Sequence, residues 1–352
     1  MNRQLKFSEA IREATDQAME RDQSVYIIGL GVPDPKGIFG TTLGLLEKYG
    51  AERVQDMPLS ENAMTGVALG SALVGMRPII THQRMDFALV AMEQMVNQAA
   101  KWHYMFGGKA KVPMVVRMII GRGWGQGPQH SQSLQAWFAH IPGLKVVMPT
   151  TAHDAKGLLA AAIEDNNPVI FIEHRWLHNI ADEVPEEYYT VPLGKARVMC
   201  EGSDVTIVGT SYMALESLQA AEHLREEGIS AEVIDLRTIR PWDVETVLTS
   251  IRKTGRLVVT DTAGAAFGVS AEIAATVLER EFASIKSAPV RIALPDHPCP
   301  TSPALSDHYY PRAGRIALEV KKMLGHKTVA ESLDASPGHR LDVPDPSFKG
   351  PF

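Results

Sequence analysis

Cysteine is nearly absent from this chain, with only Cys200 and Cys299 among 352 residues. The two lie far apart in the sequence and form no C-x-x-C pair, so neither a disulfide framework nor a thiolate metal site is predicted. Sparse, unpaired cysteine is typical of a reducing compartment. We therefore expect a cytoplasmic protein.

Long apolar runs and an excess of positive charge are also lacking. No apolar stretch reaches the ~18 residues that a membrane-spanning helix needs. The first residues, MNRQLKFSEAIREA, enter a helical pattern without the apolar core of a signal peptide. The formal net charge of -6 offers no basic surface to a polyanion. We expect neither a membrane nor a nucleic acid as partner, which leaves small molecules and proteins.

Helical and strand-like patterns alternate along the chain. Phe7, Ile11, Ala14 and Ala18 form one apolar stripe at helical spacing before the strand-like run 25–28. The later pattern predicts helices at 60–73, 88–105 and 151–164, and strands at 77–81, 112–120, 146–147 and 169–172. This order predicts an α/β fold with a mainly parallel sheet covered by helices on both faces.

The periodicity lapses in a polar, acidic stretch at 175–196, which we interpret as a linker between domains. A second alternating series begins at residue 204, so we expect two doubly wound domains. The predicted boundaries are 1–195 with the linker, 196–326 for the smaller second domain, and 327–352 for an extended, proline-containing C-terminal tail.

A loop with the sequence GRGWGQGPQ follows the predicted strand 112–120. Four glycines in so short a segment indicate a functional or mobile loop. It lacks the G-K-[ST] ending of a phosphate-binding loop, and the second domain lacks G-x-G-x-x-G after Val208. We therefore do not interpret the loop as a phosphate-binding loop, and the Rossmann-like pattern of the second domain is not evidence for a nucleotide.

Several long segments together carry a family resemblance. They are RVQDMPLSENAMTGVALGSALVGMRPI, NQAAKWHYMFGGKAKVPMVVR, QHSQS, PGLKVVMPTTAHDAKGLLAAAIEDNNPVI, EGISAEVIDLRTIRPWD and KTGRLVV. In this order and spacing the chain resembles the beta subunits of the decarboxylating component of pyruvate and branched-chain 2-oxoacid dehydrogenase complexes. These belong to the transketolase-like superfamily, and the resemblance covers residues 4 to about 325. It implies a pyrimidine-binding domain followed by a transketolase C-terminal-like domain.

Glu61 matches the family glutamate that hydrogen-bonds the aminopyrimidine ring of thiamine diphosphate. That ring is weakly basic, and it gains a proton only beside a fixed, poorly solvated acid, after which it removes the thiazolium proton. Taken alone, Glu61 is better explained as an acidic residue that complements the dipole of a first helical turn after Ser60. The resemblance reverses that preference.

Three further residues match positions of the family site. Phe87 matches the aromatic residue that packs against the aminopyrimidine, although a plain core role explains it equally well. Gln83 lies where relatives often place another cofactor-side residue, but the surrounding H-Q-R-M-D-F departs from the family pattern and leaves the substrate open. His130 in P-Q-H-S-Q-S matches a histidine that assists substrate binding or acyl handling, and a histidine titrates near working pH.

The resemblance implies two metal ions, potassium and magnesium. The segment A-I-E-D-N-N resembles a loop that holds a structural potassium ion in some relatives, through the residues matching Met114, Ala162, Asp165 and Asn167. An ordinary helix end explains that segment equally well. Relatives bind the cofactor diphosphate through magnesium held by a G-D-G motif and a later Asn, and G-D-G occurs nowhere in this sequence.

The missing motif implies an active site built from two chains. A partner alpha subunit would hold magnesium and the diphosphate in an alpha2 beta2 heterotetramer, while this chain would supply Glu61 and the pyrimidine pocket. The predicted function is the beta subunit of a 2-oxo acid dehydrogenase, an oxidoreductase that passes an acyl group to the lipoyl domain of an acyltransferase. Two alternatives stay open: a split transketolase-like or acyloin-forming enzyme without lipoyl transfer, and a non-catalytic scaffold subunit.

Overall fold

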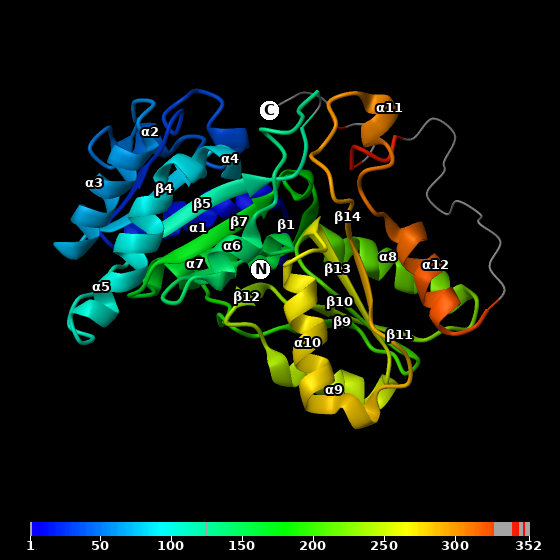
Figure 1. The fold of residues 1–352 in the computed structure, drawn as a ribbon. Coiled ribbons are helices and arrows are strands. Elements are labelled where there is room, and N and C mark those ends of the chain that lie inside the picture. Colours follow the sequence, from blue (N-terminus) through cyan, green and yellow to red (C-terminus); the bar gives the residue numbers. More distant parts are fainter. Residues whose placement is uncertain (1, 124, 327–339, 345–347, 349–352) are drawn as a thin grey trace. The chain divides into compact units, whose positions relative to one another are not determined.

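The computed structural model describes residues 2–123, 125–326, 340–344 and 348. The chain divides into two compact units, the first comprising residues 1–120 and 137–193 and the second 121–136 and 194–352. Each unit combines a mainly parallel sheet with helices (Figure 1), which confirms the predicted fold class. Within the described residues, no helix has both the length and the apolar content that crossing a bilayer requires.

A parallel sheet forms the centre of the first unit. Its strands run in the order β6-β7-β5-β4-β2-β3. Their bounds are Val25–Ile28 for β2, Val54–Gln55 for β3, Arg77–His82 for β4, Val115–Ile120 for β5, Lys145–Val147 for β6 and Val169–His174 for β7. Every residue of β2, β5 and β7 is buried, as expected for parallel strands that are covered on both faces.

The helices predicted at 60–73 and 151–164 start within one residue of the predicted positions. The apolar stripe of α1 (Phe7–Arg21) is buried, and α1 packs against α7 (Ala152–Glu164). The Thr151 hydroxyl accepts a hydrogen bond from the Asp154 backbone N–H at 3.1 Å, which caps α7. The other helical segments are η1 (Ile38–Gly40), α2 (Leu45–Tyr49), α3 (Glu61–Leu73), α6 (Gln135–His140) and η4 (Arg175–Leu177).

Two regions of the first unit differ from the pattern-based prediction. The single helix expected at 88–105 is a series of α4 (Met85–Ala88), η2 (Leu89–Ala91), the π-helical η3 (Gln94–Ala99) and α5 (Ala100–Met105). Apolar periodicity does not distinguish these hydrogen-bond patterns. The stretch expected as a linker contains β8 (Ala181–Pro185), which pairs antiparallel with β1 (Asn2–Lys6).

The second unit has a five-stranded sheet in the order β14-β13-β10-β11-β9, in which only β9 is antiparallel. The strands are β9 (Arg197–Cys200), β10 (Val205–Gly209), β11 (Ala231–Asp235), β13 (Leu257–Gly264) and β14 (Val290–Leu294), and β12 (Thr238–Arg240) lies nearby in sequence. The helices are α8 (Tyr212–Glu226), α9 (Val244–Thr254), α10 (Val269–Glu281), η5 (Phe282–Ser284), α11 (Pro303–Ser306) and α12 (Ala313–Met323). Buried residues of α8 and α12 share one core with β10 and β11.

A buried ion pair joins the neighbouring strands β5 and β7 of the first sheet. The Arg117 guanidinium donates to both carboxylate oxygens of Glu173, at 2.6 and 3.1 Å, and both side chains are fully buried. Burial alone would raise the pKa of Glu173, but Arg117 and the adjacent His178 hold it at about 2. The carboxylate is therefore charged at neutral pH, and its charge is balanced inside the core.

Breaking this pair should destabilise the protein strongly, because one charge would then stay buried without its partner. We expect Glu173→Gln to lower the free energy of unfolding by about 3–5 kcal/mol. Chemical denaturation followed by tryptophan fluorescence measures this change. Glu187→Gln, which makes the same change at an exposed position, should shift it by less than about 0.5 kcal/mol. Equal midpoints for the two variants would contradict a central role for the pair.

Candidate cofactor site

The first sheet has a topological switch point between β2 and β4. From β2 the chain passes to β3 on one side, and after α3 it returns to β4 on the other side. The loops that leave β2 and β4 therefore diverge at the carboxyl edge of the sheet. In open parallel sheets, ligands bind in the crevice that forms at such a point.

Glu61 is the first residue of α3, the helix that connects β3 to β4. A connecting helix in such a unit begins at the carboxyl edge of the sheet, so Glu61 lies at the same edge as the end of β4. The Ser60 carbonyl accepts from the Met64 N–H at 2.9 Å, but the Ser60 side chain makes no cap bond. The side chain of Glu61 is half-buried. α3 packs against β4, which fixes where the helix starts.

Gln83 follows β4 directly and spans the switch point. Its amide Nε2 donates to the Leu30 carbonyl in the loop after β2, at 2.9 Å. Gly31 in that loop has a φ of +73°, and a Cβ there would lie 2.9 Å from the Gln83 amide nitrogen. Only glycine fits this position without strain or displacement. The hydrogen bond holds the Gln83 side chain at the crevice.

Phe87 lies in α4, the short helix that follows β4. Its backbone N–H donates to the Arg84 carbonyl at 3.1 Å, and its side chain is half-buried. Glu61, Gln83 and Phe87 therefore lie at one edge of one sheet. They provide a carboxyl group, an amide and a flat apolar ring, a set that fits a polar heteroaromatic ring such as an aminopyrimidine.

Asp56, which sequence reasoning missed, holds two segments of the candidate site together. It follows β3, and its Oδ1 accepts from the backbone N–H of both Gly31 and Met57 at 2.9 Å. It thus ties the loop after β2 to the segment that leads into α3. The sequence signal that could have identified Asp56 is its position, since it is an acidic residue directly after a strand that ends at the switch point.

Positive charge also gathers at the carboxyl edge, around the ring of Phe39. The Arg175 guanidinium lies 4.6 Å and the Arg84 guanidinium 5.8 Å from the ring centre. Both arginines are buried and follow β7 and β4, respectively. Burial lowers the pKa of Arg175 to about 10, so it still carries a charge at neutral pH. Such an edge favours an anionic ligand.

His130 belongs to the second unit, in the glycine-rich segment 121–136. It is exposed, and its backbone N–H donates to the Gly127 carbonyl at 3.2 Å. The same segment supplies Gln135, whose amide donates to the Asp261 carboxylate at 2.6 Å. Burial raises the pKa of Asp261 to about 6, although Gln135 and nearby backbone N–H groups oppose this. Sequence reasoning missed Asp261, which lies within β13.

The predicted potassium ligands lie at the opposite edge of the first sheet, at the amino ends of β5 and β7. The Met114 carbonyl accepts from the Val169 N–H at 3.0 Å. The Asp165 carbonyl accepts from the Arg77 guanidinium at 3.2 Å, and its carboxylate pairs with Lys145 and accepts from the Asn167 N–H. Ala162 is buried in the last turns of α7. An ion held here would be structural, because Glu61 lies at the other edge.

Two family models match the chain. Residues 3–179 match the model described as transketolase, pyrimidine binding domain, and residues 194–316 match transketolase, C-terminal domain. The chain is 46% identical over 334 residues to the beta subunit of acetoin:2,6-dichlorophenolindophenol oxidoreductase from Cupriavidus necator, which covers 92% of this chain and 98% of that relative. It is 41% identical over 326 residues to the beta subunit of the mitochondrial pyruvate dehydrogenase E1 component from Bos taurus, with 91% of each chain covered.

The chain belongs to this thiamine diphosphate-dependent beta-subunit family. A solved structure described as a split gene transketolase, inactive beta4 tetramer, shares its fold with a TM-score of 0.75 and 24% identity, covering 92% of this chain and 99% of that one. Glu61, Gln83 and Phe87 all lie within the part matched by the pyrimidine-binding model.

His82, at the end of β4, is almost fully buried. It is 2% exposed, and neither ring nitrogen has a hydrogen-bond partner among the described residues. Burial lowers the pKa of His82 to about 4. The imidazole of this beta subunit is therefore neutral at neutral pH, directly beside Gln83.

This burial predicts a pH-dependent stability. Below the ordinary histidine pKa of 6.5 the unfolded chain gains a proton that the folded chain does not, so stability falls as pH decreases toward 4. We expect His82 to contribute a loss of about 2 kcal/mol between about pH 7.5 and about pH 5.

Denaturation of the parent chain and His82→Phe at both pH values measures this contribution. The variant should lose about 2 kcal/mol less than the parent over that interval. His140→Phe, which changes an exposed histidine, should follow the parent. If His82→Phe and the parent lose the same stability, His82 is not held neutral in the folded protein.

Proposed function

We propose that this chain is the beta subunit of a 2-oxo acid dehydrogenase, which decarboxylates its substrate and passes the acyl group to a lipoyl domain. The observation that carries the proposal is the position of Glu61. A carboxyl group begins the helix at the switch point of a pyrimidine-binding domain, with Gln83 and Phe87 at the same edge. That is where an aminopyrimidine needs an acid partner.

Thiamine diphosphate, when bound, supplies an acidic thiazolium carbon that adds to a carbonyl group and stores the electrons left by the departing carboxylate. Glu61 would hold a proton at the pyrimidine ring, and Phe87 would orient that ring by contact with its face. Gln83, fixed by its bond to Leu30, would provide a hydrogen-bonding group beside it. His130 would donate a proton or a hydrogen bond to the substrate or the acyl group.

The substrate class is supported by charge. A 2-oxo acid carries a carboxylate, and the edge that holds Glu61 also holds the guanidinium groups of Arg84 and Arg175 around Phe39. A second candidate is the cleavage of a neutral acyloin. It is favoured by two relatives at 46% and 42% identity that are named as acetoin oxidoreductase beta subunits. The alternative of a non-catalytic scaffold subunit does not explain why Glu61, Phe87 and His130 are all present.

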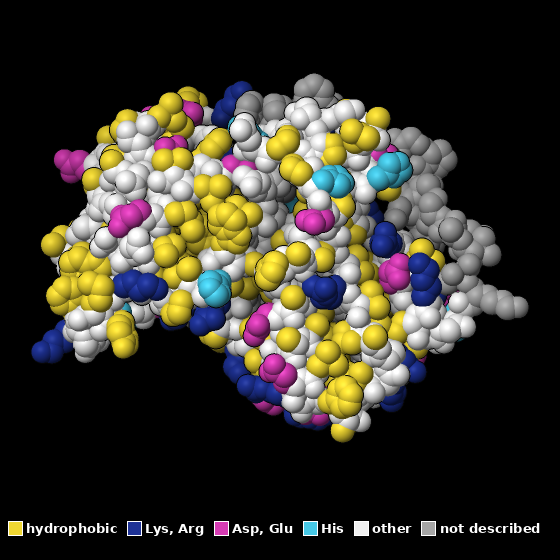
Figure 2. Space-filling model, in the orientation of Figure 1, with side chains coloured by type: hydrophobic (Ala, Val, Ile, Leu, Met, Phe, Trp, Pro, Cys, Tyr) yellow, Lys and Arg dark blue, Asp and Glu magenta, His cyan; other side chains and the backbone are white. Residues whose placement is uncertain are grey.

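A partner subunit is part of the proposal. The sequence lacks G-D-G, so an alpha subunit would hold magnesium and the diphosphate in an alpha2 beta2 assembly. The first unit presents large apolar side chains that suit such a partner, and Figure 2 shows hydrophobic side chains gathered over α5. The exposed apolar side chains of the first unit include Val67 of α3, at 54% exposure, and Tyr104 and Met105 of α5, at 89% and 61%.

The division of labour follows the predicted domains. Residues 1–195 would form the pyrimidine half of the site and 196–326 the second domain. Most of the predicted tail 327–352 lies outside the described residues. Potassium at Met114, Ala162, Asp165 and Asn167, the lipoyl acyltransferase and the cytoplasmic location stay predictions.

The role of Glu61 is tested by proton exchange. In the complex reconstituted with its alpha subunit, we expect Glu61→Ala to slow hydrogen–deuterium exchange at the thiazolium carbon by at least about a hundredfold, because the pyrimidine loses its acid partner. Assembly should be unchanged. Glu47→Gln alters an exposed glutamate in the first turn of another helix and should exchange at the parental rate. Parental exchange in Glu61→Ala would refute the role assigned to Glu61.

The substrate class is tested by supplying the reconstituted complex with a lipoyl domain. We expect reductive acylation with pyruvate or a branched-chain 2-oxo acid, detected as a mass increase of the lipoyl domain. Arg84→Met should raise KM for the 2-oxo acid by about tenfold, since it removes one of the two charges near Phe39. If acetoin is consumed and no 2-oxo acid acylates the lipoyl domain, the second candidate is correct.

A further inference from the structure

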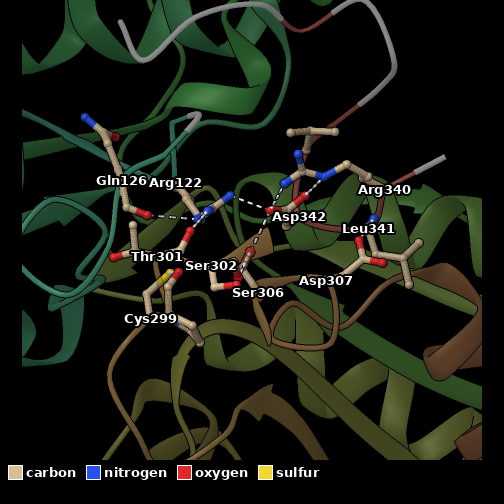
Figure 3. Close-up of polar contacts among 12 residues, drawn as sticks. Arg122, Gln126, Cys299, Thr301, Ser302, Ser306, Asp307, Arg340, Leu341 and Asp342 are labelled. Atoms are coloured by element: carbon tan, nitrogen blue, oxygen red, sulfur yellow. Dashed lines mark hydrogen bonds and ion pairs between the residues drawn. The ribbon is translucent and has the colours of Figure 1, made fainter. Parts of the chain in front are cut away.

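The C-terminal segment Arg340–Pro344, named here the strap, returns into the second unit. Asp342 at its centre is fully buried, and Val343 is 8% exposed. The C-terminal family model ends at residue 316, so the strap lies beyond the matched part of the chain. Figure 3 shows Asp342 pointing between Arg122 and Ser306.

Asp342 is held by groups from three places in the sequence. Its Oδ2 accepts from the Arg122 guanidinium at 2.5 Å and from the Ser306 hydroxyl at 2.6 Å, while its Oδ1 accepts from Arg340 Nε at 2.9 Å. Arg122 and Asp342 are both fully buried. Charge-assisted bonds of this kind are among the stronger polar contacts in a protein.

Arg122 also forms hydrogen bonds within the glycine-rich loop and to a neighbouring segment. Its Nε donates to the Gln126 carbonyl at 2.9 Å, and its second terminal nitrogen donates to the Thr301 carbonyl at 2.8 Å. The Gln126 side-chain Oε1 accepts from the Gly123 N–H at 2.8 Å. One guanidinium therefore ties Gln126 of the loop to the segment at Thr301 (Figure 3).

The loop leads directly to His130. A Cβ at Gly127 would lie 2.1 Å from Oγ1 of Thr301, so any larger residue would displace that side chain, and the Gly127 carbonyl accepts from the His130 N–H at 3.2 Å. A chain of contacts thus runs from Asp342 through Arg122, Gln126 and Gly127 to the backbone of His130. All its members belong to the second unit.

A second arginine anchors the other side of the strap. Arg312 donates to the carbonyls of Leu341 and Val343, both at 3.0 Å, and its Nε donates to the buried Glu216 at 2.9 Å. The Leu341 N–H donates to the Asp307 carboxylate at 2.5 Å. Backbone and side-chain contacts therefore hold the strap from both sides, which keeps Asp342 facing the loop.

The strap carboxylate is charged under working conditions. Burial would raise the pKa of Asp342, but hydrogen bonds from Arg340 and Ser306 and the charge of Arg122 lower it below its usual value. The partner of Arg122 is thus an anion at neutral pH. A neutral substitute of the same shape would weaken the contact without filling or emptying space.

We propose that the strap is a positioning element: Asp342 fixes Arg122, and through it the glycine-rich loop holds His130 in its working position. The positioning of His130 rests on the proposed function, in which His130 takes part in the reaction. The contact between strap and loop does not depend on any activity. The contact and the positioning are therefore tested by separate measurements.

Limited trypsin digestion tests the contact. Trypsin cuts after arginine, and the bond between Arg122 and Gly123 is buried in the parent. We expect Asp342→Asn to speed cleavage at this bond by at least about tenfold, detected by mass spectrometry as a fragment that begins at Gly123. Ser306→Ala, which removes a single hydrogen bond to Asp342, should give a smaller increase. Glu222→Gln, the control, changes an exposed residue of α8 and should cut at the parental rate.

Kinetics of the reconstituted complex test the positioning. Asp342→Asn should lower kcat by about tenfold to a hundredfold, because a misplaced catalytic group loses alignment. Glu222→Gln should keep the parental kcat. If Asp342 acts through Arg122, then Asp342→Asn in an Arg122→Met background should cause no further loss, since the two changes interrupt one chain of contacts. Circular dichroism and alpha-subunit binding identify any variant that fails to fold.

The outcomes separate the proposals. Parental cleavage after Arg122 in Asp342→Asn overturns the contact, and faster cleavage with parental kcat overturns the positioning of His130. Additive losses in the double variant also overturn it. If the parent complex turns over none of the tested substrates, the proposed function fails, while the cleavage experiment still decides whether the strap holds the loop.

Discussion

The divergence of the chain at the end of β2 fixes the arrangement of the first unit. β3 lies on one side of β2 and β4 on the other, so the loops that leave these strands separate at the carboxyl edge. That separation exposes the start of α3, and with it Glu61, beside the residues that follow β4. The Gln83 bond to Leu30 and the Asp56 bonds to Gly31 and Met57 hold the edges of the opening. Moving any of these strands would displace the site.

Buried arginine–carboxylate pairs recur at the places where distant segments meet. Arg117 with Glu173 joins β5 to β7, and Arg312 with Glu216 joins the residue before α12 to α8. Arg122 with Asp342 joins the glycine-rich loop to the strap. A buried pair contributes little net stability compared with apolar packing of the same volume. It is nevertheless costly to break, and its geometry is directional. Such pairs therefore select one arrangement of their segments over nearby alternatives.

The sequence predicted the fold well because its elements carry local signals. The stripe at Phe7, Ile11, Ala14 and Ala18 and the cap at Thr151 depend on neighbours within a few residues, and both match the structure. The resemblance predicted Glu61, Gln83 and Phe87, which the fold brings to one edge. The roles of these residues, like those of His130 and the potassium ligands, remain predictions.

The features that were missed depend on distant partners. β8 has one buried residue in five, and its partner β1 lies at the other end of the unit, so no local pattern marks either as a strand. Asp342 lies in a proline-containing stretch with little apolar pattern, yet its partner Arg122 is more than two hundred positions away in sequence. Long-range pairing of this kind is decided by the folded geometry rather than by local propensity.

The pairing of β1 with β8 brings the two ends of the first unit together. Residues 2–6 lie alongside residues 181–185, so this unit begins and finishes at one place on its surface. A module with adjacent ends can be joined to another polypeptide, or separated from it, without rerouting the chain between them. The exception is the glycine-rich segment 121–136, which clusters with the second unit, so separating the first unit would also require cutting the chain on both sides of this segment.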